Sequence, residues 1–128
     1  MQFKYTILYV ADVAKSLDFY RRAFAAKIKM LHPGNDYGEL QTGVTTLAFS
    51  SLELIRESGK NANAADIDRP CFEIAFETVD VVAAVEVALQ AGAKLIQKTE
   101  RMPWGQTIAY VADFDGNLVE ICSPVGQQ

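Results

Sequence analysis

The sequence carries one pattern twice: a strand, a helix and then three more strands. In the first copy, residues 3–10 are rich in β-branched and aromatic residues and predict a strand, and Asp12 is the expected cap of the helix. In the second copy, residues 72–77 predict the strand and Asp80 the cap. An offset of 68 positions places Asp12 on Asp80, Val13 on Val81, Ala23 on Ala91 and Ile28 on Ile96. This repeated order of elements indicates two modules of one type.

Apolar spacing and turn residues predict the remaining elements. The apolar stripe of the first helix is Val13, Leu17, Tyr20 and Phe24; that of the second is Val82, Val85 and Leu89, before a stop at Gly92. The further strands are expected at residues 27–31, 37–42, 44–50, 94–98, 107–112 and 117–122. The Asp115-Gly116 pair between the last two strands is a strong hairpin signal, because glycine accepts the positive φ of a tight turn.

The composition changes at residues 57–69, which are polar and show no periodicity. We therefore expect a first βαβββ module at residues 1–56, a connector at 57–69 and a second module at 70–126, within a single domain of residues 1–128. The predicted fold class is α+β, with each module forming a curved mixed sheet that carries a helix on one face.

Charge and hydropathy exclude several kinds of protein. The net charge of −4 and the lack of a Lys/Arg cluster argue against nucleic-acid binding. No apolar run approaches the ~20 residues of a membrane span, and the first residues do not resemble a signal peptide. Cys71 and Cys122 lack metal-type spacing, so we expect buried, reduced thiols. These features predict a cytoplasmic protein.

Two glutamates on predicted strands are the main candidates for a site. Glu120 shares a strand face with Leu118 and Cys122, where a carboxylate is costly unless it is paired, hydrated or used. Glu73 alternates with Ala75 and Glu77, so its face can line a cavity, remain wet or cover a partner subunit.

Aromatic residues add further candidates. Trp104, in a Met-Pro-Trp-Gly loop, either covers the core with its indole N–H on a carbonyl or walls a pocket where a flat ligand stacks. Tyr110 is a candidate ligand contact, although an aromatic residue on a strand more often belongs to the core. His32 sits in a predicted turn and is the only imidazole, so no nucleophile–base pair can be assembled.

Two stretches carry a family resemblance: YVADVAKSLDFYRRAF at residues 9–24 and MPWGQTIAYVADFDGNLVEICSP at residues 102–124. With the repeat, they resemble the vicinal oxygen chelate superfamily, which includes glyoxalase I, extradiol dioxygenases and bleomycin-resistance proteins. The resemblance covers nearly the whole chain. It implies the glyoxalase/bleomycin-resistance/dioxygenase-like fold and a homodimer whose modules complete each other's cups.

The resemblance also implies where a divalent metal would be held. The four positions are Tyr5, Ala48 (or Ser50 in another register), Glu73 and Glu120. Tyrosine is an unusual ligand and alanine has no donor atom, which leaves only Glu73 and Glu120 as metal candidates. We therefore expect no metal cofactor.

These observations predict a metal-independent small-molecule-binding protein. The expected ligand is cationic or antibiotic-like, bound in a cup at a dimer interface. The expected ligand contacts are Tyr5, Ala48, Ser50, Glu73, Trp104, Tyr110 and Glu120. The alternative is a glyoxalase-type lyase, isomerase or epimerase with Glu73 or Glu120 as general base, with or without a divalent metal.

Overall fold

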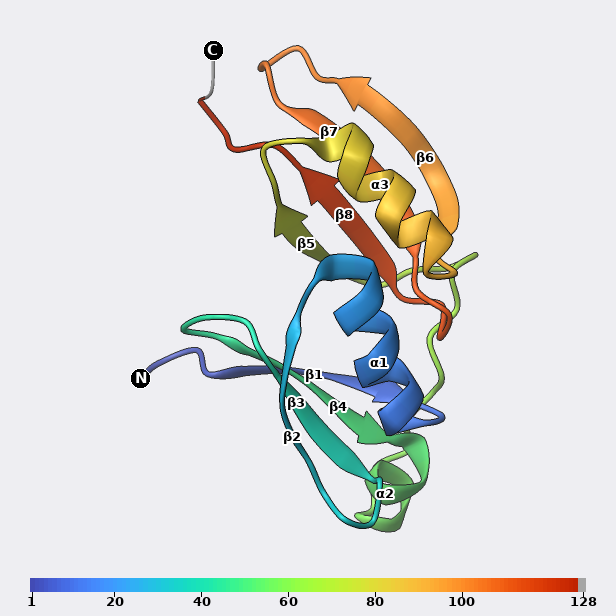
Figure 1. Cartoon of the computed structure of the whole chain (residues 1–128). Coiled ribbons are helices and arrows are strands. Elements are labelled where there is room, and N and C mark those ends of the chain that lie inside the picture. The colour runs from blue at the N-terminus through green and yellow to red at the C-terminus, as the bar shows by residue number, and fades with distance from the viewer. Residues whose placement is uncertain (127–128) are drawn as a thin grey trace. The chain divides into compact units, whose positions relative to one another are not determined.

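The computed structural model of the chain describes residues 1–126. It divides into two compact units, Met1–Ala65 and a second that begins at Asp66, so the division falls within residues 57–69. Each unit holds a four-stranded mixed sheet with a long helix across one face (Figure 1). The predicted α+β fold of two βαβββ modules is confirmed.

The first unit contains six elements. They are β1 (Tyr5–Val10), α1 (Val13–Phe24), β2 (Lys27–Leu31), β3 (Tyr37–Gln41), β4 (Thr46–Ser51) and α2 (Leu52–Glu57). The strand order is β1-β4-β3-β2, with β1 and β4 parallel and the other pairs antiparallel. The sequence did not predict α2, because six residues are too few to show a helical period. Its start is stabilised by Ser51, whose side chain accepts a hydrogen bond from the Leu54 amide at 3.0 Å.

The second unit contains β5 (Glu73–Glu77), α3 (Val81–Gln90), β6 (Lys94–Arg101), β7 (Thr107–Ala112) and β8 (Leu118–Cys122). Its strand order, β5-β8-β7-β6, repeats that of the first unit, and β5 again runs parallel to its neighbour β8. The β6 strand is three residues longer than predicted, reaching Arg101, and it pairs with β7 through two register shifts.

Helix α1 packs closely on the sheet of the first unit. The Asp12 side chain caps it by accepting from the Lys15 amide at 3.1 Å, as predicted. A Cβ added to Gly38 of β3 would lie 2.6 Å from Cδ1 of Leu17, so only glycine permits this approach. Val13 and Leu17 of the predicted stripe are fully buried. The core of this unit therefore lies between α1 and one face of the sheet.

Helix α3 buries a stripe that shares only Val85 with the one predicted. Val81, Val85 and Ala88 are buried, whereas Val82 is 57% exposed and Leu89 is half-buried. The Asp80 side chain accepts from the Ala83 amide at 3.1 Å and so sets where the helix begins. The sequence of α3 is apolar on several sides, so its spacing was compatible with more than one stripe; packing on the sheet selected the stripe that starts at Val81.

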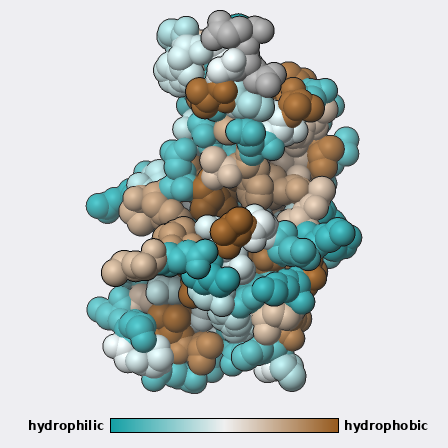
Figure 2. All heavy atoms as spheres, turned by 90° about the vertical axis from the view of Figure 1, so that its left-hand side faces the viewer, coloured by the Kyte–Doolittle hydropathy of each residue, from teal (hydrophilic) through white to brown (hydrophobic). Residues whose placement is uncertain are grey.

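Hydrophobic side chains also reach the surface, where they lie among hydrophilic ones (Figure 2). On β1, Tyr5 and Ile7 are 45% and 42% exposed. Among the described residues, no helix combines the length and the hydropathy needed to cross a membrane.

Candidate functional site

The strand register shows which side chains of the second unit share a face. Glu120 of β8 pairs with Ala75 of β5 and with Tyr110 of β7, and paired residues point to the same side of a sheet. Val119 and Ile121, at 0% and 1% exposure, point to the opposite side, which α3 covers. Glu120 and Tyr110 therefore lie on the face without a helix, which we call the open face.

Three candidate residues converge on this open face. The hydroxyl of Tyr110 lies 3.1 Å from Oε2 of Glu73 and 3.1 Å from Oε2 of Glu120. A phenolic hydroxyl has one proton, so it donates to one carboxylate at a time. The remaining carboxylate oxygens stay available as acceptors. We call Glu73, Tyr110 and Glu120 the acidic triad.

The acidic triad forms no ion pair with a basic side chain of residues 1–126. None of the ion pairs among the described residues includes Glu73 or Glu120. Burial raises the pKa of Tyr110 above its usual range. The hydrogen bond to Glu120 and the negative charges of Glu120 and Glu73 raise this pKa further. Tyr110 therefore stays protonated and acts as the hydrogen-bond donor of the triad.

Cys122 lies two residues beyond Glu120 on the same face. Its Sγ is 3.7 Å from the Phe76 carbonyl oxygen. Burial raises the pKa of the Cys122 thiol, and the charges of Glu120 and Glu77 add to the rise. The prediction of two buried thiols is correct for Cys122 and wrong for Cys71, which is exposed because it lies before the first strand of the second unit, outside its core.

The same register assigns the matching positions of the first unit. Ala48 pairs with Ile7 of β1 and Glu39 of β3, so it stands where Glu120 stands in the second unit. Glu39 thus corresponds to Tyr110. By the same register Tyr5 corresponds to Glu73, and Ser50 to Cys122. The sequence left open whether Ala48 or Ser50 is the counterpart of Glu120. The strand pairing shows that it is Ala48.

The open face of the first unit is charge-balanced instead of acidic. The Tyr37 hydroxyl donates to Oε2 of Glu39 at 2.8 Å, and Nζ of Lys29 lies 3.7 Å from Oε1 of Glu39. Burial raises the pKa of Tyr37 above its usual range, with Glu39 adding to the rise. Sequence reasoning missed this group, although the Tyr37–Glu39 spacing of two residues on one strand is a signal that was present.

The donor set does not fit the divalent metal that the superfamily implies. At the two matching positions of the first unit, Tyr5 is a poor ligand and Ala48 has no donor atom. In the second unit, Tyr110 already bonds both glutamates. Among residues 1–126, no group of three or more His, Cys, Asp or Glu side chains is arranged to hold a metal.

Trp104 lies apart from the triad, in the turn between β6 and β7. The indole is 57% exposed, and its N–H donates to Oε1 of Gln106 at 2.9 Å. Nε2 of Gln106 in turn donates to the Ser123 carbonyl at 2.9 Å. The interpretation that Trp104 covers the core is therefore correct only for its hydrogen bond. The indole N–H bonds the side-chain carbonyl of Gln106, but the ring is exposed and does not cover the core.

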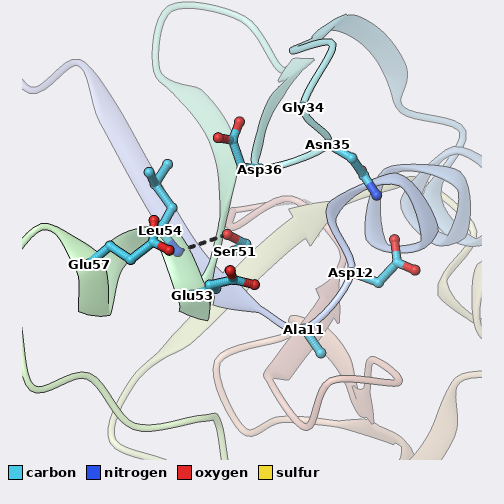
Figure 3. Close-up of a pocket in the computed structure, with 9 residues that line it drawn as sticks. All are labelled: Ala11, Asp12, Gly34, Asn35, Asp36, Ser51, Glu53, Leu54 and Glu57. Atoms are coloured by element: carbon cyan, nitrogen blue, oxygen red, sulfur yellow. Dashed lines mark hydrogen bonds between the residues drawn. The ribbon is translucent and has the colours of Figure 1, made fainter.

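The first unit also contains a polar hollow of about 370 Å³ (Figure 3). The start of α1, the β2–β3 turn and α2 line it, and its carboxylates come from Asp12, Asp36, Glu53 and Glu57. Asn35 connects two of these elements, because its side-chain oxygen accepts from the Ala14 amide at 2.9 Å. Sequence reasoning did not find this hollow, since its residues come from three separate segments. The amides of Ala14, Lys15 and Leu54 at its helix starts are already bonded to side chains of the protein.

Comparison with known proteins identifies the class. Residues 3–126 match the family model of the glyoxalase-like domain. The chain is 30% identical over 128 residues to a lactoylglutathione lyase of Neisseria meningitidis, covering 94% of this chain and 88% of the relative. It superposes with a TM-score of 0.84 on a glyoxalase-related enzyme of Fulvimarina pelagi, at 22% identity and with 99% and 94% of the two chains covered. A glyoxalase/bleomycin resistance protein/dioxygenase family enzyme of Burkholderia phytofirmans gives 0.80 at 20% identity, covering 96% and 98%.

The family-model match over residues 3–126, together with the two βαβββ units, thus identifies a protein of the vicinal oxygen chelate superfamily. The chain belongs to the glyoxalase-like domain family of that superfamily.

Proposed function

We propose that this chain is a metal-independent small-molecule-binding protein whose acidic triad receives the cationic part of an organic ligand. The observation that carries the proposal is the convergence of Glu73 and Glu120 on the Tyr110 hydroxyl at 3.1 Å each. One donor faces two carboxylates, so the site has a surplus of hydrogen-bond acceptors. A ligand that brings both N–H donors and positive charge satisfies that surplus.

The position of the triad supports binding of a small molecule. Glu73 is exposed and Glu120 is half-buried, so the pair is reachable while partly shielded from solvent. Partial shielding strengthens a charge-assisted hydrogen bond relative to one in bulk water. Leu118, which is half-buried beside Glu120 on its face, adds apolar surface for the rest of the ligand. An antibiotic-like cation matches this mixture of charge and apolar surface.

Isothermal titration calorimetry with butylammonium as a probe tests the proposal. We expect Glu120→Gln to weaken binding roughly three- to tenfold, the range for a partly exposed charged hydrogen bond. The matched control is Glu86→Gln, which removes the same charge from the exposed surface of α3 and should leave the affinity unchanged. Equal affinities of the wild type and Glu120→Gln would contradict the proposal.

The second candidate is a glyoxalase-type lyase, isomerase or epimerase. The observation that favours it is the 30% identity to the Neisseria meningitidis lactoylglutathione lyase. In such an enzyme Glu73 or Glu120 would act as the general base that removes a proton beside a carbonyl, while Tyr110 holds the carboxylate in place. Lactoylglutathione lyase activity that is lost in Glu120→Gln would establish this candidate in preference to a pure binding protein.

A further inference from the structure

We infer that Glu77 is a third carboxylate for the cation of the proposed ligand, that this cation lies over Ala75, and that it is a primary ammonium group. The inference rests on the proposed function, because the acidic triad supplies the other two carboxylates. It adds a contact residue, a place on the sheet and the kind of cation.

Strand β5 carries an alanine between two glutamates on the open face. Ala75 pairs with Glu120, which belongs to that face, so Ala75 points to the same side. Glu73 and Glu77 lie two residues before and two residues after Ala75, about 6.7 Å away in each direction, and alternation puts them on this side too. Ala75 is therefore bordered by three glutamates: two along its own strand and Glu120 beside it on β8.

Ala75 leaves space between these glutamates. It is exposed, and β5 is an edge strand of the sheet, whose order is β5-β8-β7-β6. An alanine side chain ends at Cβ, whereas each of its three neighbours extends to a carboxylate. An atom of a ligand can therefore approach the sheet more closely over Ala75 than over any of the glutamates. A larger side chain at this position would fill that space.

The charge of Glu77 acts on the same surroundings as the charge of Glu120. Glu77 pairs with Cys122, and after burial the charges of Glu120 and Glu77 both raise the pKa of the Cys122 thiol. None of the ion pairs among residues 1–126 includes Glu77. Lys94 also belongs to the open face, through its pairing with Ala112, but it lies on β6 at the opposite edge of the sheet. The β5 side of the open face is thus acidic.

The distances within the triad favour a cation that donates hydrogen bonds. Oε2 of Glu73 and Oε2 of Glu120 each lie 3.1 Å from the Tyr110 hydroxyl oxygen, so the two carboxylate oxygens are at most 6.2 Å apart. Any bend at the hydroxyl brings them closer, and one nitrogen whose hydrogen bonds are about 2.8 Å long can then bridge the two carboxylates. A primary ammonium has a third N–H, which Glu77 can accept.

A quaternary ammonium group carries the same charge but has no N–H to donate. It would leave the carboxylates of Glu73, Glu77 and Glu120 without the hydrogen bonds that they exchange for water. Proteins recognise quaternary ammonium groups with several aromatic rings, whereas Tyr110 is the one aromatic member of this group of residues. The chemistry of the site therefore selects a primary ammonium.

Two probes of equal charge test the kind of cation: butylammonium and butyltrimethylammonium. By isothermal titration calorimetry the wild type should bind butylammonium roughly three- to tenfold more tightly, the range for charge-assisted hydrogen bonds at a partly exposed site. Equal affinities, or tighter binding of butyltrimethylammonium, would overturn the assignment of a primary ammonium.

Two variants test the third carboxylate and the place of the cation. Glu77→Gln should weaken butylammonium binding roughly two- to fivefold, whereas Glu86→Gln, on the exposed surface of α3, should leave it unchanged. Ala75→Val adds bulk without changing any charge and should also weaken binding several-fold. Its matched control is Ala83→Val, which makes the same change at an exposed position of α3. Thermal unfolding verifies that each variant is folded.

Each outcome decides one part of the inference. Wild-type affinity in Glu77→Gln would overturn the third carboxylate, and wild-type affinity in Ala75→Val would overturn the place over Ala75. If Glu120→Gln weakens butylammonium binding while these two variants do not, the present inference fails and the proposed function stands. If butylammonium does not bind to the wild type at all, both fail.

Discussion

The Tyr110 hydroxyl joins Glu73 and Glu120 across three strands of one sheet, although Glu73 is 37 residues away in the sequence and Glu120 is 10. In the first unit a tyrosine also bonds a glutamate, but at other positions and locally: Tyr37 donates to Glu39, two residues along β3. The units also differ in their ion pairs. In the first unit Nζ of Lys29 lies 3.7 Å from Oε1 of Glu39, whereas no basic residue of the described chain forms an ion pair with the triad. The two copies of one fold thus present open faces of different charge.

Stability should fall at alkaline pH through Tyr37 and Tyr110. The folded protein raises the pKa of both hydroxyls above the usual tyrosine value of about 10. The folded state therefore keeps protons that the unfolded state releases, so this stabilisation is present below pH ~10 and declines as the pH rises toward the shifted values.

The double variant Tyr37→Phe/Tyr110→Phe tests that linkage. Its free energy of unfolding should decline less steeply above pH ~10 than that of the wild type, as measured by urea unfolding at a series of pH values. Parallel slopes for the double variant and the wild type would show that these tyrosines do not carry the alkaline dependence.

The purified protein should hold no stoichiometric transition metal. Tyr5 and Ala48 stand at two of the four positions where metal-binding relatives are expected to place ligands, and two carboxylates without an imidazole bind zinc or nickel poorly. Elemental analysis after dialysis against Zn²⁺, Ni²⁺, Mn²⁺ and Mg²⁺ measures this directly. About one transition-metal ion per chain would refute both the expectation and the assignment of the site.

Gly38→Ala should destabilise the first unit by about 1–3 kcal/mol, the usual cost of overpacking. The added Cβ would lie 2.6 Å from Cδ1 of Leu17 and 3.2 Å from both the Met30 carbonyl oxygen and Cγ1 of Val13. Gly34→Ala is the matched control, because its nearest neighbour would be 3.6 Å away, on the Asp36 side chain. Denaturant unfolding of both variants should separate them; similar midpoints would show that α1 moves to accommodate the methyl group.

The two thiols should react at very different rates. Cys71 is exposed, whereas Cys122 is buried and its thiol pKa is raised by burial and by the nearby Glu120 and Glu77. Because the thiolate is the reactive form, a disulfide reagent should modify Cys71 quickly and Cys122 slowly in the folded protein. Cys71→Ser should abolish the fast phase. If two fast thiols are seen, Cys122 is not shielded in solution.

We propose that the chain forms a homodimer at micromolar concentration. The support is apolar surface on the open face of β1, where Tyr5 and Ile7 are 45% and 42% exposed, since large apolar patches commonly mark an interface. Sedimentation velocity should give twice the chain mass of 14.1 kDa. Replacing Ile7 with Lys should shift the population to monomer. A monomeric wild type would refute the proposal.

Much of the fold was determined by local sequence. Asp12 and Asp80 both cap helices as predicted, because a carboxylate placed directly before an apolar stripe satisfies the first free amides wherever the helix later packs. The alternation that put Glu120 on the face of Leu118 and Cys122 is likewise local, since the period of a strand is a property of its backbone. Glu73, Tyr110 and Glu120 were therefore all candidates from the sequence, and the resemblance already implied that the two glutamates share one site.

Only the tertiary structure brought those members together. The strand order β5-β8-β7 sets Glu73, Glu120 and Tyr110 side by side, and the pairing of β4 with β1 and β3 matches Ala48, not Ser50, to Glu120. Packing likewise chose Val81 over Val82 as the buried residue of α3. Strand order, register and the buried side of an apolar helix depend on hydrogen bonds and contacts between distant segments, and no local stretch of sequence contains those partners.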